Sequence, residues 1–328
     1  MSGLVTIFGG SGFVGRYVAR RMAEAGWRVR VAVRRPNEAL FVRTYGAVGQ
    51  VEPILCNIRE RESVAAALKG ADAVVNCVGI LNETGRNTFG LVQHYGALHV
   101  AEEAAKARVG RLVHISAIGA DPHAKSTYAE TKGLGEQAVL EHFPTAVILR
   151  PSVIFGPEDQ FFNRFASMAR FAPVLPVTGG NTLFQPVYVD DVARAAVLGV
   201  TGEAAPGVYE LGGPEVRSFA ELMETMLEVI GRRNRIVLNL PLAVSAVMGT
   251  LFDLLQRLSL GLFTNTILTR DQVTNLALDN VVGKDMPGLA ELGIEPVAIE
   301  AVLPEYLWRY RPSGQFHEIR ESARRLRS

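Results

Sequence analysis

Near the start of the chain, glycine recurs at every third position between a short apolar run and a helical pattern. Gly9, Gly12 and Gly15 follow Leu4–Phe8 and open a segment with helical spacing that reaches Ala25. So tight a turn between a strand and a helix needs residues that tolerate a positive φ. It also lets phosphate oxygens approach free N–H groups at the positive end of the helix. The sequence therefore predicts a dinucleotide-binding turn, and a plain strand-to-helix turn is the alternative.

Short apolar runs alternate with helical segments over the first two thirds of the chain. This alternation is typical of a parallel sheet whose two faces are both covered by helices. We expect an α/β fold with a doubly wound parallel sheet of Rossmann type and a smaller C-terminal α+β region. The expected parts are a nucleotide-binding core over 1–155, a substrate-like or docking region over 156–310, and a basic tail over 311–328. Within the second part, about 187–212 is expected to return to the core.

Composition excludes several classes of protein. The chain has 328 residues, of which 48% are apolar and 20% charged, and its net charge is +1. Disorder is therefore excluded as the dominant state, and no nucleic-acid partner is indicated. Its two cysteines make no disulfide framework, and its six histidines show no spacing typical of a metal site. We expect no signal peptide and no membrane span, because charged residues such as Asp253 and Arg257 interrupt the most apolar stretch, 238–263.

The end of the second expected strand bears on the choice of cofactor. NAD sites usually place an acidic residue here, where it holds the ribose 2′-hydroxyl. This chain has Arg34 and Arg35 instead, and a guanidinium group suits a 2′-phosphate. Arg16, directly after the last glycine, can add to the same charge cluster. We therefore favour NADP(H) over NAD(H), and we expect one of Arg34 and Arg35 to face water.

Further segments follow in the order typical of the extended, atypical branch of the short-chain dehydrogenase/reductase superfamily, which the chain resembles over roughly residues 3–215. They are the glycine turn, Asn57-Ile58, Asn76–Gly79, Arg111–Ser116, Tyr128-x-x-x-Lys132, Leu149–Pro157 and Val187–Ala193. Asn57 stands where the superfamily usually has aspartate. The resemblance implies that the cofactor contacts Gly9, Gly10, Ser11, Gly12, Phe13, Val14, Gly15, Arg16, Arg34, Arg35, Asn57, Ile58, Cys77, Val78, Gly79, Ile115, Ser116, Tyr128, Lys132, Pro151, Ser152 and Val153.

Tyr128 and Lys132 share one helix face because they are four residues apart. An ammonium beside a phenol favours the phenolate, so we expect Lys132 to lower the pKa of Tyr128 from about 10. In active members of the superfamily this tyrosine exchanges a proton with the substrate oxygen, while the nicotinamide exchanges a hydride. Such members usually have two or three hydroxyl residues after the fifth strand, whereas only Ser116 stands here, before Ala117 and Ile118. Losing such a donor costs on the order of 100-fold in rate, so no catalytic residue is firmly assigned.

A closer resemblance is to the NADPH-binding accessory subunits of respiratory complex I. It rests on the runs FGGSGFVGRYVARRM, HISAIGAD, YAETKGLGE, LRPSVIFGPED and PVYVDDVARA. It implies a tightly held, mainly structural NADPH, little or no catalysis by the chain itself, and contacts with other subunits on the peripheral arm near the membrane. A start without a presequence would suit a bacterial version on the cytoplasmic side of the inner membrane.

The C-terminal region then becomes a candidate contact with a partner or with the membrane surface. Apolar side chains recur at helical spacing over 241–263, and arginines are frequent over 309–327. A buried helix and a solvated tail are the alternatives.

Two other functions stay open at the level of sequence. One is a free-standing NAD(P)H-dependent reductase, epimerase or dehydratase that uses Tyr128 and Lys132 with help from Ser116. Its substrate would be a nucleotide sugar, a steroid or a quinone-like compound. The other is a redox sensor that reports the NADP(H) ratio to a partner.

Overall fold

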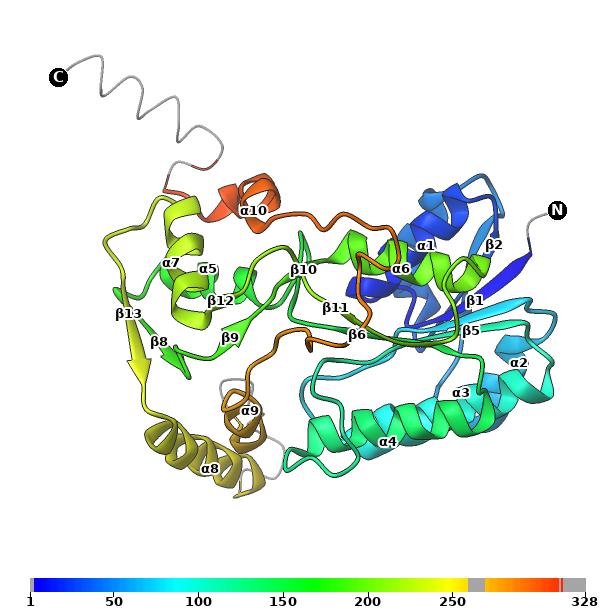
Figure 1. Ribbon diagram of the computed structural model, residues 1–328, viewed down its shortest axis with the longest axis horizontal. Helices are drawn as coiled ribbons and strands as arrows, with labels where there is room; N and C mark the ends of the chain where they lie inside the picture. Colours follow the sequence, from blue (N-terminus) through cyan, green and yellow to red (C-terminus); the bar gives the residue numbers. More distant parts are fainter. Residues whose placement is uncertain (1–2, 259–268, 313, 315–328) are drawn as a thin grey trace, which may run out of the picture.

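The main sheet of the protein has seven parallel strands in the computed structural model, which describes residues 3–258, 269–312 and 314 (Figure 1). The strands follow the order β11-β6-β5-β4-β1-β2-β3. Their bounds are β1 Leu4–Phe8, β2 Arg28–Val33, β3 Val51–Leu55, β4 Ala73–Asn76, β5 Arg111–Ile115, β6 Val147–Pro151 and β11 Gly207–Leu211. The order reverses between β1 and β4, where dinucleotides bind in sheets of this kind. The expected doubly wound α/β fold is confirmed.

Helices cover both faces of this sheet (Figure 1). On one face lie α1 (Phe13–Glu24) and α6 (Val189–Thr201), and on the other lie α2 (Arg61–Leu68), α3 (Tyr95–Lys106) and α4 (Thr127–His142). Strand side chains alternate between the two faces, so each face has its own buried core. This is why the strands are apolar at nearly every position.

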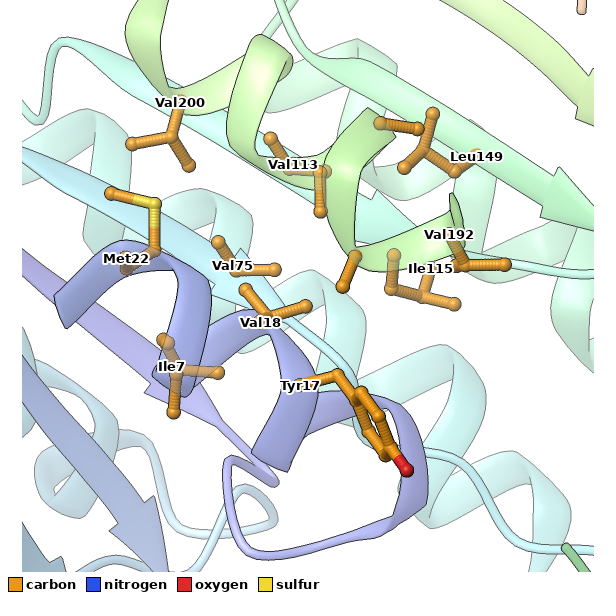
Figure 2. Packing of buried hydrophobic residues seen from close by; sticks show 14 of the residues in the cluster. Ile7, Tyr17, Val18, Met22, Val75, Val113, Ile115, Leu149, Val192 and Val200 are labelled. Atoms are coloured by element: carbon orange, nitrogen blue, oxygen red, sulfur yellow. The ribbon is translucent and has the colours of Figure 1, made fainter. Parts of the chain in front are cut away.

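Figure 2 shows the core beneath α1 and α6. Tyr17, Val18 and Met22 of α1 and Val192 and Val200 of α6 are all buried there. They pack over the strand residues Ile7, Val75, Val113, Ile115 and Leu149. Each large apolar side chain buried in this way contributes about 1.5–3 kcal/mol. The packing fixes α1 on the sheet and thereby sets the position of its N-terminus beside the glycine turn.

A separate core lies beyond the sheet. It is enclosed by α5 (Phe162–Ala169), α7 (Phe219–Val229) and α10 (Ile299–Leu307), beside the parallel pair β8 (Val174–Thr178) and β13 (Ile236–Leu240). The remaining elements are η1 Pro36–Tyr45, η2 Gly90–His94, β7 Ile154–Phe155, β9 Leu183–Phe184, β10 Val187–Tyr188, β12 Arg217–Ser218, α8 Leu242–Leu258, α9 Arg270–Asn275 and η3 Trp308–Tyr310.

Helix α9 is held against the start of α4 by side-chain hydrogen bonds. Asp271 of α9 accepts hydrogen bonds from the Ser126 hydroxyl and from the backbone N–H groups of Thr127 and Tyr128, at the start of α4. The expected basic tail, 311–328, lies almost wholly outside the described residues. Within the described part of the chain, no helix has the length and apolarity needed to cross a membrane.

The two outer strands of the sheet each have a distinctive feature. The edge strand β3 contains Pro53. The N–H of Cys56, directly after β3, donates to the carbonyl of Val33 on the β2 side. Successive N–H groups of a strand point to opposite sides, and Pro53 is an odd number of residues from Cys56. The nitrogen of Pro53 therefore faces the open edge. At the other edge, the N–H of Glu210 on β11 donates to the carbonyl of Pro287, and the Glu210 carboxylate accepts from the N–H of Gly283.

Candidate functional site

The glycine turn forms a cradle that leaves no room for side chains. Gly9 has φ +75°, and its carbonyl accepts a hydrogen bond from the N–H of Gly12 at 2.9 Å. A Cβ on Gly15 would lie 2.3 Å from that carbonyl oxygen. Helix α1 begins directly after Gly12, and no side chain caps it. Its first N–H groups can therefore receive an anion such as a pyrophosphate, and the cradle fits a dinucleotide.

A pocket of about 260 Å³ opens beside this turn, where β1, β2, β3 and β4 end. The expected cofactor residues that line it are Gly9, Ser11, Gly12, Arg34, Asn57, Ile58, Cys77, Val78 and Gly79. Eight further lining residues were not expected from the sequence: Phe8, Ala32, Val33, Cys56, Arg59, Ile80, Asn87 and Val92. Of these, Arg59 had a signal, since it directly follows Asn57-Ile58. Asn87 belongs to a loop without a recognisable motif.

The three arginines expected at the 2′-phosphate lie in different surroundings. Arg34 lines the pocket, and its Nη1 donates to Asn87 Oδ1 at 3.1 Å. Arg35 faces water and pairs with Glu38 at 3.0 Å. The side chain of Arg16 does not join this cluster. It donates to carbonyls of the glycine turn and pairs with Glu158 at 3.3 Å, because its place in the first turn of α1 directs it there.

Asn57 is held by its own neighbours. Its Nδ2 donates to Glu60 at 2.6 Å, and its Oδ1 accepts from the backbone N–H and the Nε of Arg59. Ile58 is buried and packs closely against Gly96. An amide and an aliphatic side chain thus flank the pocket where the adenine is expected. Gly10 packs against Val31, whereas the partly buried side chains of Phe13 and Val14 pack against the core beneath α1.

The expectation that Lys132 lowers the pKa of Tyr128 is wrong. Burial raises the pKa of Tyr128 to about 12, and its ring packs edge-on against Phe89, with centroids 5.8 Å apart. Lys132 donates its Nζ hydrogen bond to the carbonyl of Ile115 at 3.1 Å. Burial also lowers the pKa of Lys132 to about 8, against the opposing charge of Glu136. Desolvation therefore sets the direction of both pKa shifts, which helical spacing alone does not predict.

Two buried polar atoms near Lys132 have no hydrogen-bond partner among the described residues: Ser116 Oγ and His114 Nε2. The other ring nitrogen of His114 lies 3.1 Å from Asn76 Nδ2, and burial lowers the pKa of His114 to about 3. Buried polar atoms nearly always have hydrogen-bond partners. These two atoms therefore mark a place where a bound group or a water molecule would form hydrogen bonds with the protein. The hydroxyl is single, since Ala117 and Ile118 follow it.

The end of β6 is held by a residue that the sequence did not single out. The Ser152 hydroxyl donates to the backbone carbonyl of Asn280 at 2.8 Å, and the N–H of Val153 donates to Asn280 Oδ1 at 3.1 Å. Pro151 is the last residue of β6. Asn280 lies more than a hundred positions further along the chain, so no local pattern could identify it.

The site can hold and orient a nicotinamide dinucleotide, which when bound supplies hydride exchange. The glycine turn, Arg34 and Asn57 line the pocket, and Tyr128 and Lys132 lie on α4. Among residues 3–258, 269–312 and 314, no group of three or more His, Cys, Asp or Glu side chains could hold a metal ion.

Comparison with known proteins agrees with this geometry. The family described as NAD dependent epimerase/dehydratase matches residues 5–212. The Arabidopsis thaliana protein NADH dehydrogenase (ubiquinone) 1 alpha subcomplex subunit 9, mitochondrial, is 33% identical over 325 residues, covering 96% of this chain and 80% of that protein. A ceramide reductase from Caulobacter vibrioides is 31% identical over 255 residues, covering 76% of this chain and 78% of that protein.

A solved structure shares the fold across both parts of the chain. It is dTDP-glucose 4,6-dehydratase from Streptomyces venezuelae with NAD bound; the TM-score is 0.70 at 20% identity, covering 94% of this chain and 96% of that one. The complex I relative is mitochondrial by its name, so it does not support the expectation of a bacterial inner membrane. By the family match and by the likeness to a complex I subunit over nearly its whole length, the chain belongs to the NAD dependent epimerase/dehydratase family, within the extended short-chain dehydrogenase/reductases that include this accessory subunit of complex I.

Proposed function

We propose that this chain is an accessory subunit of the proton-pumping NADH:quinone oxidoreductase, respiratory complex I, and that it holds NADPH mainly as a structural group. The observation that carries the proposal is the 33% identity to a complex I subunit across 96% of the chain. Its partners are then other subunits of that complex, on the peripheral arm near the membrane.

In this proposal the nucleotide lies along the pocket at the carboxyl ends of the strands. The N–H groups after Gly12 bind the pyrophosphate, and Arg34 binds the 2′-phosphate. Asn57 and Ile58 flank the adenine, and Tyr128 with Lys132 holds the nicotinamide ribose. A nucleotide that binds only the folded chain stabilises it by mass action, which suits a structural role.

The raised pKa of Tyr128 and the hydrogen bond of Lys132 to the backbone support the proposal that the chain itself has little or no catalytic activity. A general acid works best when its pKa is near the operating pH. The pKa of Tyr128 is instead raised to about 12, and Lys132 is bonded to a backbone carbonyl. The residues after Ser116 supply no second hydroxyl to polarise a substrate carbonyl.

We also propose that the C-terminal region contacts the membrane surface, which makes the chain a peripheral subunit. Apolar side chains are exposed along β13 and α8, at Ile236, Leu238, Val244, Val247 and Leu251. Arg232, Arg233 and Arg235 directly precede β13. Cations beside an exposed apolar strip suit the interface of an anionic lipid layer.

The test is gentle extraction of native membranes with a mild detergent, native gel separation and mass spectrometry of the bands. We expect the chain to migrate with the large NADH dehydrogenase and NADPH to be released when that band is denatured. A purified complex that lacks this chain, or a chain that migrates alone, would contradict the proposal.

A second candidate is a free-standing reductase. It is favoured by the intact Tyr128-x-x-x-Lys132 pair and by the likeness to the Caulobacter ceramide reductase. In this case Tyr128→Phe abolishes substrate-dependent NADPH oxidation and leaves nucleotide binding intact. A purified wild-type chain without turnover on a broad carbonyl panel that includes ceramide-related lipids would exclude it.

A further inference from the structure

The adenosine end of the pocket is lined by two arginines from neighbouring strands. Arg34 follows β2 and Arg59 lies in the loop after β3. The two strands are parallel and paired, with Val33 opposite Leu55, so both loops leave the same edge of the sheet. The sequence pointed to Arg34 and Arg35, and the structure brings Arg59 to the pocket in addition.

One loop after β4 orients both guanidinium groups. Asn87 Oδ1 accepts from Arg34 Nη1 at 3.1 Å, and the carbonyl of Arg86 accepts from Arg59 Nη1 at 2.8 Å. The loop is itself closed by two backbone hydrogen bonds between Thr84 and Asn87, at 2.9 and 3.1 Å. A third bond, from Arg59 Nε to Asn57 Oδ1 at 3.2 Å, fixes the second arginine from the strand side. Both side chains are thus oriented before any ligand arrives.

The charge of these two arginines is not neutralised by the protein. Within the described part of the chain, neither Arg34 nor Arg59 forms an ion pair, whereas the neighbouring Arg35 and Arg16 pair with Glu38 and Glu158. A guanidinium has five N–H donors, and the bonds above use only some of them. The free donors and the double positive charge suit a phosphate monoester, which carries nearly two negative charges at neutral pH.

We propose that Arg59 is a specificity-determining residue, which together with Arg34 binds the 2′-phosphate of NADPH. The proposal rests on the proposed NADPH assignment and extends it to a residue from a different strand. Asn87 and the carbonyl of Arg86 are the positioning groups of this clamp.

The test measures dissociation constants for NADPH and NADH with the purified full chain, by isothermal titration calorimetry. The variants are Arg59→Gln and, as a matched control, Arg43→Gln, since Arg43 is exposed and pairs with Glu52 away from the pocket. We expect Arg59→Gln to weaken NADPH binding about tenfold, or ~1.4 kcal/mol. NADH affinity should change less than twofold, and Arg43→Gln should change neither constant.

The outcomes separate the two proposals. A wild-type chain that binds NADPH and NADH equally well overturns the NADPH assignment itself. A wild-type preference for NADPH that Arg59→Gln leaves unchanged, or a variant that weakens both nucleotides equally, overturns only the role of Arg59. If Arg59→Gln does not fold, Arg59→Lys decides, because an ammonium cannot form the planar fork. It should reduce the NADPH preference at least threefold, and an unchanged preference would overturn the inference.

Discussion

Replacing Gly15 by alanine should damage both the fold and the nucleotide site. The added Cβ would lie 2.3 Å from the Gly9 carbonyl oxygen and 2.7 Å from Gly10 Cα, whereas ordinary contact begins at 3.4 Å. Both neighbours are backbone atoms, so no side chain can turn away. The N-terminus of α1 must therefore move from the turn by about an ångström, which strains the core that fixes α1 on the sheet.

The expected cost follows from two opposed effects. Overpacking of this kind destabilises by about 1–3 kcal/mol. Alanine in place of glycine within a helix stabilises the fold by about 0.5–1 kcal/mol, because less backbone entropy is lost on folding. The net loss of unfolding free energy then lies between about 0 and 2.5 kcal/mol, with a midpoint of about 1 kcal/mol. Because the Gly9 carbonyl also accepts the N–H of Gly12, the shift disturbs the cradle, and we expect nucleotide affinity to fall more than tenfold.

Urea unfolding measures the stability, and calorimetric titration measures nucleotide affinity. Gly90→Ala is the matched control, because nothing lies within 4 Å of its added Cβ. It should leave nucleotide binding unchanged and raise the unfolding free energy by about 0.5 kcal/mol. If Gly15→Ala proves as stable as the wild type and binds nucleotide equally well, the close approach of α1 to the turn does not have the proposed role.

Three further changes test other features. Lys132→Met should stabilise the nucleotide-free chain at pH 7 by about 1–3 kcal/mol, because the folded pKa of Lys132 is near 8, below its unfolded value. The same variant should bind the nucleotide more weakly. Urea unfolding with and without NADPH measures both effects. The unfolding free energy should fall as the pH drops from about 6.5 toward 3, because in this range only the unfolded chain protonates His114. In His114→Gln the unfolding free energy should depend less on pH over this range. An unchanged slope would contradict a buried, neutral His114 ring. Asp271→Ala should lower the unfolding free energy by about 1–2 kcal/mol through the lost helix cap of α4, and an unaltered thermal midpoint would argue against it.

Local pattern was enough for the parts of the site that lie within one strand-turn-helix unit. The spacing of Gly9, Gly12 and Gly15 predicted a turn whose tightness the structure explains through the approach of Gly15 to the Gly9 carbonyl. The alternation of strands and helices predicted the doubly wound sheet. Both depend on neighbours in sequence, where period and residue type are informative.

Features created by tertiary packing could not be predicted in this way. The spacing of Tyr128 and Lys132 is helical, yet the pKa of each is set by burial that depends on Phe89 and on the strand ends. Asn280 reaches β6 from a position far along the chain. Arg59 directly follows Asn57-Ile58, yet its place beside Arg34 depends on which loops share an edge of the sheet. The contacts of Phe89 with Tyr128 and of Asn280 with β6 were hidden by sequence separation, not by residue type.

The two outer strands limit how this protein can assemble with others. An exposed strand edge is a template on which another chain can add a strand. Here Pro53 removes a donor from the open edge of β3, and the segment around Pro287 already bonds to the outer side of β11. Strand addition is thus disfavoured at both ends of the sheet, which also protects the chain from edge-to-edge aggregation. Association with other subunits is therefore expected through side chains on helices and loops, where surface chemistry rather than backbone pairing selects the partner.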